Sequence, residues 1–257
     1  MLKCRVGFYT VIWLMAAGAY LGSTENPSRS PEAEQLVFQA TNKFRLENKL
    51  PALIWDQRLS DIAYDHSVDM IVRNFFDHVN PDGRNPMERI HRRHRQFIGN
   101  AGENLSVLVA SPPLAPSLIS DKAIGSWLDS PPHRANLLDP AFTHVGIGIA
   151  IAGVEAKTTQ DFMQVRGMLE QPLPELLAHG EKLELKVVPF PEDSAKAEKY
   201  ILEPLLPGSE SAERVPWDLS VRHPKASPGR YRLQFCFPAP PSRFLEVFPV
   251  PEIEIAK

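Results

Sequence analysis

An α+β fold is predicted by two patterns that occupy different parts of the chain. Apolar residues recur at helical spacing over residues 30–48, 59–73 and 121–129, whereas 144–153 and 162–169 alternate apolar with small or polar residues, as strands do. Helices followed by strands, rather than interleaved with them, are typical of α+β proteins. A tail with two further alternating segments adds a separate all-β region.

The expected helices differ in how clearly their ends are marked. Ser30 is suited to cap the first helix, and Pro31 fits its first turn. The second helix, 59–73, carries His66 and Met70 on its apolar stripe. We therefore interpret His66 as a hydrogen-bonded core histidine rather than a ligand.

The strands at 144–153 ("HVGIGIAIAG") and 162–169 ("FMQVRGML") are expected to pair. The polar segment "EAKTTQD" between them reads as their connection. His144 immediately precedes the first strand, and its role is left open.

The tail differs from the rest of the chain in composition. Of the 25 prolines, 14 lie from Pro172 onward, which places a boundary near 171–180. The segments "KLELKVVPF" (182–190) and "GRYRLQFCF" (229–237) alternate as half-buried strands do. We expect a small, sandwich-like β domain over 178–257, without a motif for chemistry.

The N-terminus has the pattern of an export signal. Lys3 and Arg5 precede an uncharged apolar run, 6–22, that contains the small residues Ala17-Gly18-Ala19. Residues 1–22 are therefore predicted to be a signal peptide. An uncleaved anchor is the alternative, because the run is near the lower length limit of a spanning helix.

Composition limits the remaining possibilities. The net charge of −3 gives no general attraction to nucleic acid, and 43% apolar residues are ample for a packed core. Of the two cysteines, Cys4 lies in the predicted signal, so the exported chain would keep only Cys236. An intramolecular disulfide is then impossible.

Four segments follow one another in a characteristic order: "NKFRLENKLPALIWDQRLSDIAYDHSVDM" (42–70), "FFDHVNPDG" (75–83), "GENL" (102–105) and "SWLDSPPHRANLLDPAFTHVGIGIA" (126–150). The ordered set resembles the CAP superfamily, also called the SCP domain, which includes cysteine-rich secretory proteins, antigen 5 and plant pathogenesis-related 1 proteins. The resemblance covers about 33–170. The "SPPHRANLL" form is similar to the bacterial branch of the family, which usually lacks disulfides.

The resemblance implies a fold and a cleft. Residues 30–172 would form a CAP-type α-β-α sandwich, and the cleft would be lined by His78, Glu103 and His133. At the fourth cleft position the family carries a second acid, and here Ser130 stands in its place. Claims of metal binding or acid–base chemistry are weaker for that reason.

The residue types nevertheless suit a cation. Imidazole nitrogen is a good ligand for zinc and similar ions, so His78 and His133 are candidates to hold zinc or another divalent cation. Their rings should then approach within about 5 Å. Glu103 is a third ligand, a group that orients a histidine, or a candidate acid–base catalyst without metal.

Three functions are compatible with these features. The first is a secreted CAP protein whose cleft binds a metal or an extracellular ligand such as a lipid, sterol, peptide or glycan, without turnover. The second is a metal-assisted or acid–base hydrolase acting on an extracellular substrate. The third is a structural or interaction protein of the cell envelope. The first is favoured, because neither an HExxH motif nor a Ser/His/Asp order supports hydrolysis.

The basic run "ERIHRRHRQ" (88–96) is interpreted as a solvated face or loop. A weak contact with an anionic surface is the alternative. The side chains that would make it are Arg89, Arg92, Arg93 and Arg95.

Overall fold

The computed structural model describes most of the chain from residue 26 onward. The predicted signal peptide, 1–22, lies outside the described residues. The described residues are 26–178, 181, 183, 185–191, 197, 199–205, 217–218, 228–238 and 245–256.

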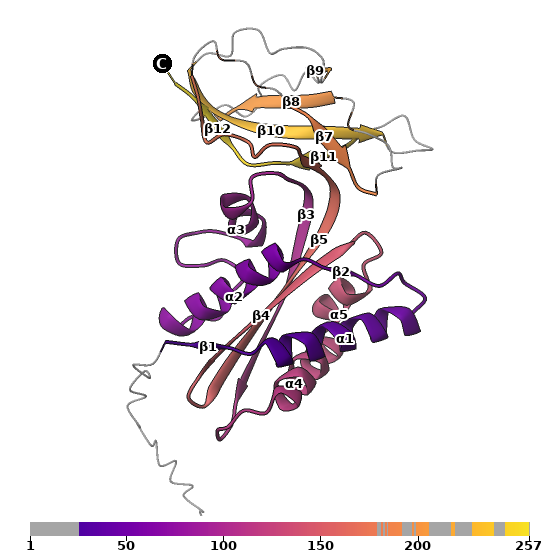
Figure 1. Cartoon of the computed structure of the whole chain (residues 1–257), viewed down its shortest axis with the longest axis vertical. Coiled ribbons are helices and arrows are strands. Elements are labelled where there is room, and N and C mark those ends of the chain that lie inside the picture. Colours follow the sequence, from indigo (N-terminus) through magenta and orange to yellow (C-terminus); the bar gives the residue numbers. More distant parts are fainter. Residues whose placement is uncertain are drawn as a thin grey trace, which may run out of the picture.

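Five helices and two sheets make up the described part (Figure 1). The helices are α1 (Pro31–Glu47), α2 (Gln57–Val72), α3 (Pro86–Arg93), α4 (Pro116–Asp129) and α5 (Pro131–Leu138). The first sheet contains β1 (Ser28–Arg29), β2 (Ile54–Trp55), β3 (Phe97–Val109), β4 (His144–Ala152), β5 (Glu155–Leu169) and β7 (Val187–Pro189). The second contains β6 (Leu176–Leu177), β8 (Lys199–Pro204), β9 (Trp217–Asp218), β10 (Gly229–Pro238), β11 (Leu245–Pro249) and β12 (Ile253–Ile255).

The first sheet is the middle layer of three, which confirms the predicted α+β class and its α-β-α arrangement. Its long strands run antiparallel in the order β1-β4-β5-β3. On one face, α1, α4 and α5 pack on the alternate apolar residues of β4, among them Val145, Ile147 and Ile149. On the other face, α2 and α3 cover Phe97 and Val165. The two layers of helices are visible on opposite sides of the sheet in Figure 1.

The α2 helix approaches β4 unusually closely because β4 carries glycines on that face. A Cβ at Gly146 would meet the backbone of Ser60, and one at Gly148 would meet the backbone of Tyr64. The hydroxyl of Ser60 also donates to the Ile147 carbonyl, at 2.7 Å. The alternation with glycine seen in the sequence therefore serves helix packing as well as the strand.

Several element ends differ from the sequence prediction. α2 begins at residue 57 rather than 59, because the Asp56 side chain accepts hydrogen bonds from the first-turn amides of Arg58 and Leu59. α4 begins at Pro116, five residues earlier than expected. The predicted cap by Ser30 is wrong in detail, since its side chain makes no capping hydrogen bond.

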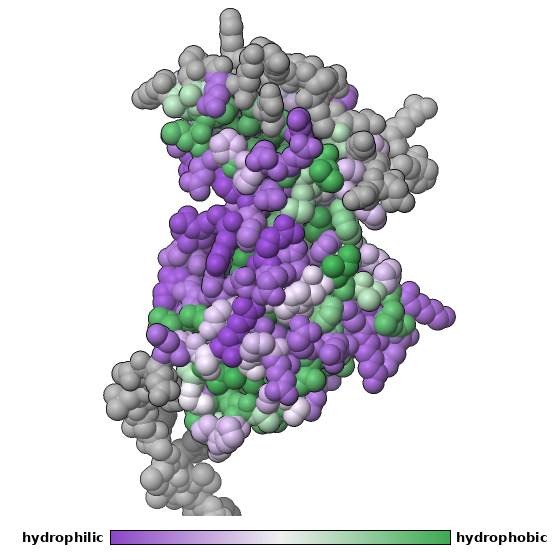
Figure 2. All heavy atoms as spheres, in the orientation of Figure 1, coloured by the Kyte–Doolittle hydropathy of each residue, from purple (hydrophilic) through white to green (hydrophobic). Residues whose placement is uncertain are grey.

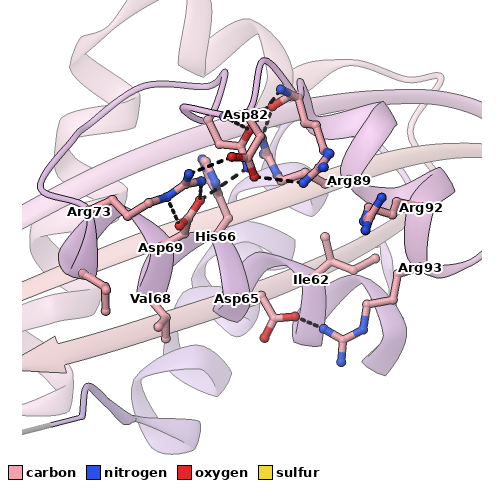
Figure 3. Close-up of a pocket in the computed structure, with 13 residues that line it drawn as sticks. Ile62, Asp65, His66, Val68, Asp69, Arg73, Asp82, Arg89, Arg92 and Arg93 are labelled. Atoms are coloured by element: carbon pink, nitrogen blue, oxygen red, sulfur yellow. Dashed lines mark hydrogen bonds and ion pairs between the residues drawn. The ribbon is translucent and has the colours of Figure 1, made fainter.

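Residues 88–93 of the basic run belong to α3, so of the two expectations the loop is wrong for them, whereas Arg92 and Arg93 are exposed on the helix. Asn85 and Glu88 form a capping box that starts α3. The α3 arginines face α2 (Figure 3), and Figure 2 shows hydrophilic side chains gathered over these two helices. The expected surface role is wrong for Arg89, which is buried. It is also wrong for Arg95, whose guanidinium donates to the carbonyls of Leu173, Pro174 and Glu252.

The long strand β3, which contains the "GENL" segment, was not recognised from the sequence. The predicted strand 162–169 is only the second half of β5, which already begins at Glu155, within the segment predicted to be a connection. The reversal occurs instead at Gly153, where φ is +58°. Several polar residues of β5 are buried with distant partners; Thr159, for example, hydrogen-bonds to Ser67 at 2.8 Å.

The tail forms one sheet within its described residues, rather than the two layers of a sandwich. The predicted strand at 229–237 is confirmed as β10. Only residues 187–189 of the other predicted strand form one, and it pairs with β5 of the first sheet; residues 182 and 184 of that segment lie outside the described part. The apolar face of the second sheet packs against Ile98 and Leu169 of the first.

Two smaller observations complete the fold. The Cys236 side chain is a free, buried thiol. None of the helices in the described residues combines the length and apolar character needed to cross a bilayer.

The contact between α2 and β4 yields a stability prediction. Gly148→Ala is expected to destabilise the fold by about 2 to 3 kcal/mol, because the new Cβ overlaps the α2 backbone, which must shift. Gly125→Ala is the control, since a Cβ added there on α4 would have nothing within 4 Å, and it should stabilise by about 0.5 to 1 kcal/mol. Urea unfolding measures both, and a Gly148→Ala variant as stable as wild type would contradict the packing described.

Candidate functional site

The predicted cleft residues come from three separate elements. His78 lies in the segment between α2 and α3, Glu103 lies in the middle of β3, and His133 lies in the first turn of α5. Ser130 separates α4 from α5, and its side chain makes no capping hydrogen bond. The fold thus brings side chains from distant parts of the sequence to one place.

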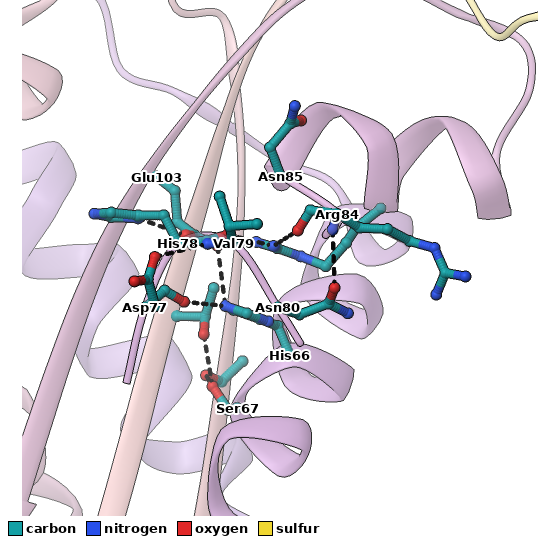
Figure 4. Close-up of polar contacts among 12 residues, drawn as sticks. His66, Ser67, Asp77, His78, Val79, Asn80, Arg84, Asn85 and Glu103 are labelled. Carbon is teal, nitrogen blue, oxygen red and sulfur yellow. Dashed lines mark hydrogen bonds and ion pairs between the residues drawn. The ribbon is translucent and has the colours of Figure 1, made fainter. Parts of the chain in front are cut away.

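Glu103 is the centre of this group. Its side chain is 1% exposed, and His78 Nδ1 lies 2.7 Å from Oε1 (Figure 4). The Arg89 guanidinium donates to the other oxygen, Oε2. Both carboxylate oxygens are therefore engaged by cationic or polar side chains inside the protein.

Arg89 also fixes the backbone around His78. Its Nη1 donates to the carbonyl of His78 at 2.7 Å and to that of Arg84 at 3.1 Å. The Asn80 side chain accepts from the amides of Asp82 and Arg84, which closes the turn between these residues. Because Arg89 bonds both Glu103 and the segment that carries His78, the position of that segment depends on the carboxylate.

His133 is placed by the residue next to Glu103. The Asn104 side chain donates to the His133 carbonyl at 3.2 Å. Asn136, one turn later in α5, donates to the Glu103 carbonyl at 3.1 Å. α5 is thus attached to β3 on both sides of the acid, and the ring centres of His78 and His133 lie 6.4 Å apart.

His66 lies beneath the group and is a core histidine, as predicted. It is 1% exposed, and its Nε2 lies 3.0 Å from the Asp77 carbonyl. A carbonyl only accepts, so Nε2 carries the hydrogen. Burial, aided by the charge of Arg89, lowers the pKa of His66 to about 4, and the ring is neutral at pH 7. Its Nδ1 has no partner among the described residues.

Asp161 is a member of the group that the sequence did not reveal. It stands directly opposite Glu103 in the pairing of β3 with β5 and is completely buried. Burial, followed by the negative charge of Glu103, raises the pKa of Asp161 well above its usual value. The raised pKa favours the neutral form of this carboxyl. The only available signal was its place in a polar segment that looked like a loop.

The protonation of Glu103 and of the two histidines follows from burial. Burial raises the pKa of Glu103 to about 7, against the opposing charge of Arg89. Burial also lowers the pKa values of His78 and His133, the latter with help from the charge of His78. Above about pH 7 the Glu103 carboxylate accepts from His78 Nδ1–H, which leaves His78 Nε2 with a lone pair.

The fit of these residues to a metal ion is partial. Two imidazoles lie side by side with their ring centres 6.4 Å apart, but Glu103 uses its oxygens within the protein. Within the described residues, no group of three or more His, Cys, Asp or Glu side chains is arranged to hold an ion. The donor set suits an open site of two histidines completed by water, not a closed structural zinc site.

The remaining sequence candidates lie outside this group. His144 Nδ1 lies 2.8 Å from the Thr143 hydroxyl, and the ring packs against Phe190. Arg93 is exposed and pairs with Asp65. Arg92 is exposed on α3.

Comparison with known proteins identifies what the first sheet and its helices resemble. Residues 38–162 match the family described as the cysteine-rich secretory protein family, CAP. Two curated relatives come from Bacillus subtilis. The uncharacterized membrane protein YlbC is 32% identical over 117 residues, 46% of this chain and 31% of the relative. The uncharacterized protein YkwD is 31% identical over 131 residues, 51% of this chain and 48% of the relative.

A solved structure gives a similar result. An extracellular protein containing an SCP domain from Bacillus anthracis is 32% identical, with a TM-score of 0.43, over 51% of this chain and 40% of that one. The matches thus span about a third to a half of the relatives' own lengths.

The buried acid pair yields a pH-dependent prediction. Because the folded pKa of Asp161 is raised, its carboxyl favours folding at low pH and opposes it as pH rises above about 4, the usual unfolded value. Asp161→Asn keeps the shape of the side chain and removes the ionisable group. Between pH 4 and pH 8, the free energy of unfolding of the variant should rise by about 1 to 3 kcal/mol relative to that of wild type.

Urea unfolding at the two pH values checks this prediction. Asp121→Asn, on the exposed surface of α4, is the control and should show no such gain. An equal effect of Asp161→Asn at both pH values would mean that Asp161 ionises normally in the folded protein.

Proposed function

Because residues 38–162 of this chain belong to the CAP family, we propose that the protein is exported and that its His78–His133 cleft binds an extracellular ligand without turning it over. Two features support export: the signal-like pattern of residues 1–22, and the description of the relative YlbC as a membrane protein. The ligand classes that suit such a cleft are a lipid, sterol, peptide or glycan.

One observation carries the proposal of binding rather than catalysis. Glu103, the acid of the cleft, is buried and has both oxygens engaged by His78 and Arg89. A catalytic base must reach the proton it removes. Here the carboxylate instead orients His78, whose side chain is 48% exposed and presents Nε2 outward from the acid.

A divalent cation such as zinc is part of the proposal. His78 Nε2 and one nitrogen of His133 would hold it, and a bound ion would polarise a ligand oxygen or carry a water molecule. Glu103 would support His78 from behind, as carboxylates commonly do for metal-bound histidines. Ser130 contributes no charge, so the affinity is expected to be modest.

Zinc titration by calorimetry tests the cation. Wild type should bind at pH 7.5, and the double variant His78→Ala with His133→Ala should not. Because burial lowers the pKa of both rings, binding should persist at pH 6.5 and weaken as pH falls further through these lowered values. His94→Ala, a histidine at the end of α3, is the control. Equal binding by wild type and the double variant would exclude these histidines as the site.

A hydrolase is the second candidate, and one observation favours it. The pKa of Glu103 is about 7 and a histidine lies 2.7 Å away, which is the state that acid–base catalysis requires at neutral pH. The engaged oxygens of Glu103 count against this function in the arrangement observed.

Activity assays separate the two functions. Wild type is expected to show no turnover of casein, of ester substrates or of glycoside substrates between pH 5 and 9. The hydrolase would instead show activity with an inflection near pH 7 that Glu103→Gln abolishes. Glu47→Gln, exposed at the end of α1, should leave any such activity unchanged. Turnover with this pattern would overturn the proposal of a purely binding cleft.

A further inference from the structure

A pocket of ≈ 570 Å³ lies between α2 and α3, apart from the His78–His133 cleft (Figure 3). Neither His78 nor His133 lines it. Its apolar wall comes from α2, through Ile62, Val68 and Val72. Its volume falls in the range typical of small-molecule sites, about 300 to 1,000 Å³.

Positive charge predominates in this pocket. Five arginines and three aspartates line it, an excess of two positive charges. Arg89, Arg92 and Arg93 are spaced i, i+3 and i+4 along α3, so one face of the helix supplies all three. The others, Arg73 and Arg84, come from the end of α2 and the following turn.

Most of these arginines already have carboxylate partners. Arg93 pairs with Asp65, and Arg89 is held by Glu103. Arg73 is held by both oxygens of Asp69, at 2.5 Å each, and also binds Asp82 at 2.9 Å. Arg84 binds Asp82 at 2.9 Å. Arg92 is exposed and makes no ion pair with any residue that the structure describes.

Asp82 is surrounded by more positive charge than it can neutralise. A hydrogen bond from Arg73, together with the charges of Arg73, Arg84 and Arg92, lowers the pKa of its carboxyl. Asp82 and Asp69 together face the guanidinium groups of Arg73, Arg84 and Arg92, so one positive charge remains for a further anion. Guanidinium groups bind oxyanions with two parallel hydrogen bonds, which suits carboxylate and phosphate equally well.

Two residues that line the pocket, His66 and Arg89, each leave one nitrogen atom without a partner in the described part of the chain, one an acceptor and the other a donor. His66 Nδ1 and Arg89 Nε are buried and lack partners among the described residues. His66 Nδ1 is a bare acceptor, because Nε2 carries the hydrogen, whereas Arg89 Nε carries a hydrogen to donate. A hydrogenphosphate ion has both P–O⁻ acceptors and a P–OH donor, and a carboxylate has no donor.

We propose that this pocket binds a phosphate group through Arg92, with Arg84 and Arg93 beside it, and that Asp82 competes for the same arginines. The group could belong to a soluble phosphate or to the headgroup of an anionic lipid, since both offer the same oxygens. The site is separate from the proposed cleft and does not depend on it.

Nuclear magnetic resonance titration of the exported chain with inorganic phosphate, at constant ionic strength, tests the proposal. Phosphate should shift the amide signals of α3 and of residues 80–84. Arg92→Gln should weaken binding by about tenfold, the effect of losing a charge-assisted hydrogen-bond pair. Asp82→Asn should strengthen it, and Arg134→Gln, an exposed arginine of α5, should not change it.

Vesicle sedimentation identifies the source of the phosphate. Phosphatidylglycerol vesicles that retain wild type but not Arg92→Gln point to a lipid headgroup, whereas phosphate binding without vesicle binding points to a soluble ligand. Either result supports the site. The proposed phosphate site would be overturned if neither probe bound wild type, or if Arg92→Gln and Arg134→Gln behaved alike.

Discussion

The buried carboxylate of Glu103, held between Arg89 and His78, is the interaction on which the candidate site depends. A buried charge is tolerated only when its partners are close and its remaining lone pairs are satisfied, and removing one partner of such a pair typically costs about 3 to 5 kcal/mol. Arg89 supplies the positive charge that balances the carboxylate, and it also donates a hydrogen bond to the backbone of the segment that carries His78. Burial raises the pKa of Asp161, opposite Glu103, and so disfavours a second negative charge beside the first.

The Glu103 carboxylate connects the two proposed sites through its partner Arg89. Arg89 faces Glu103 on one side and lines the α2–α3 pocket on the other. On the opposite flank, Asn104 and Asn136 attach α5, so that His133 approaches His78. A single strand, β3, thereby positions a loop histidine and a helix histidine whose separation in sequence exceeds fifty residues. This arrangement explains why His78 is well oriented although it is half exposed.

Amphipathic periodicity predicted α1, α2 and β4 well, because each presents a continuous apolar stripe to one sheet. The periodicity failed for α3, since its inward side chain is Arg89, whose partner lies on another element. A local signal did exist there: Asn85 and Glu88 have the spacing of a capping box. The polar half of β5 was mistaken for a connection because its side chains are satisfied by distant residues, such as Ser67 for Thr159.

The sequence likewise predicted some residues of the candidate site and missed others, because their contacts come from distant parts of the chain. His78, Glu103 and His133 were found through ordered motifs, and the structure places them together. Asp161 could not be found, because its position opposite Glu103 depends on strand register, which no local pattern specifies. The hydrogen bond that fixes His78 was foreseen only as one of several roles for Glu103.

The protonation of His78 tests this account most directly. If Glu103 accepts from Nδ1–H, the nitrogen-15 spectrum at pH 8 should show His78 protonated at Nδ1 and bare at Nε2. Glu103→Ala should return the ring to the mixture of tautomers seen for a free histidine, and Glu47→Ala should leave it unchanged. A wild-type His78 that carries its hydrogen on Nε2 would contradict the central role of the carboxylate.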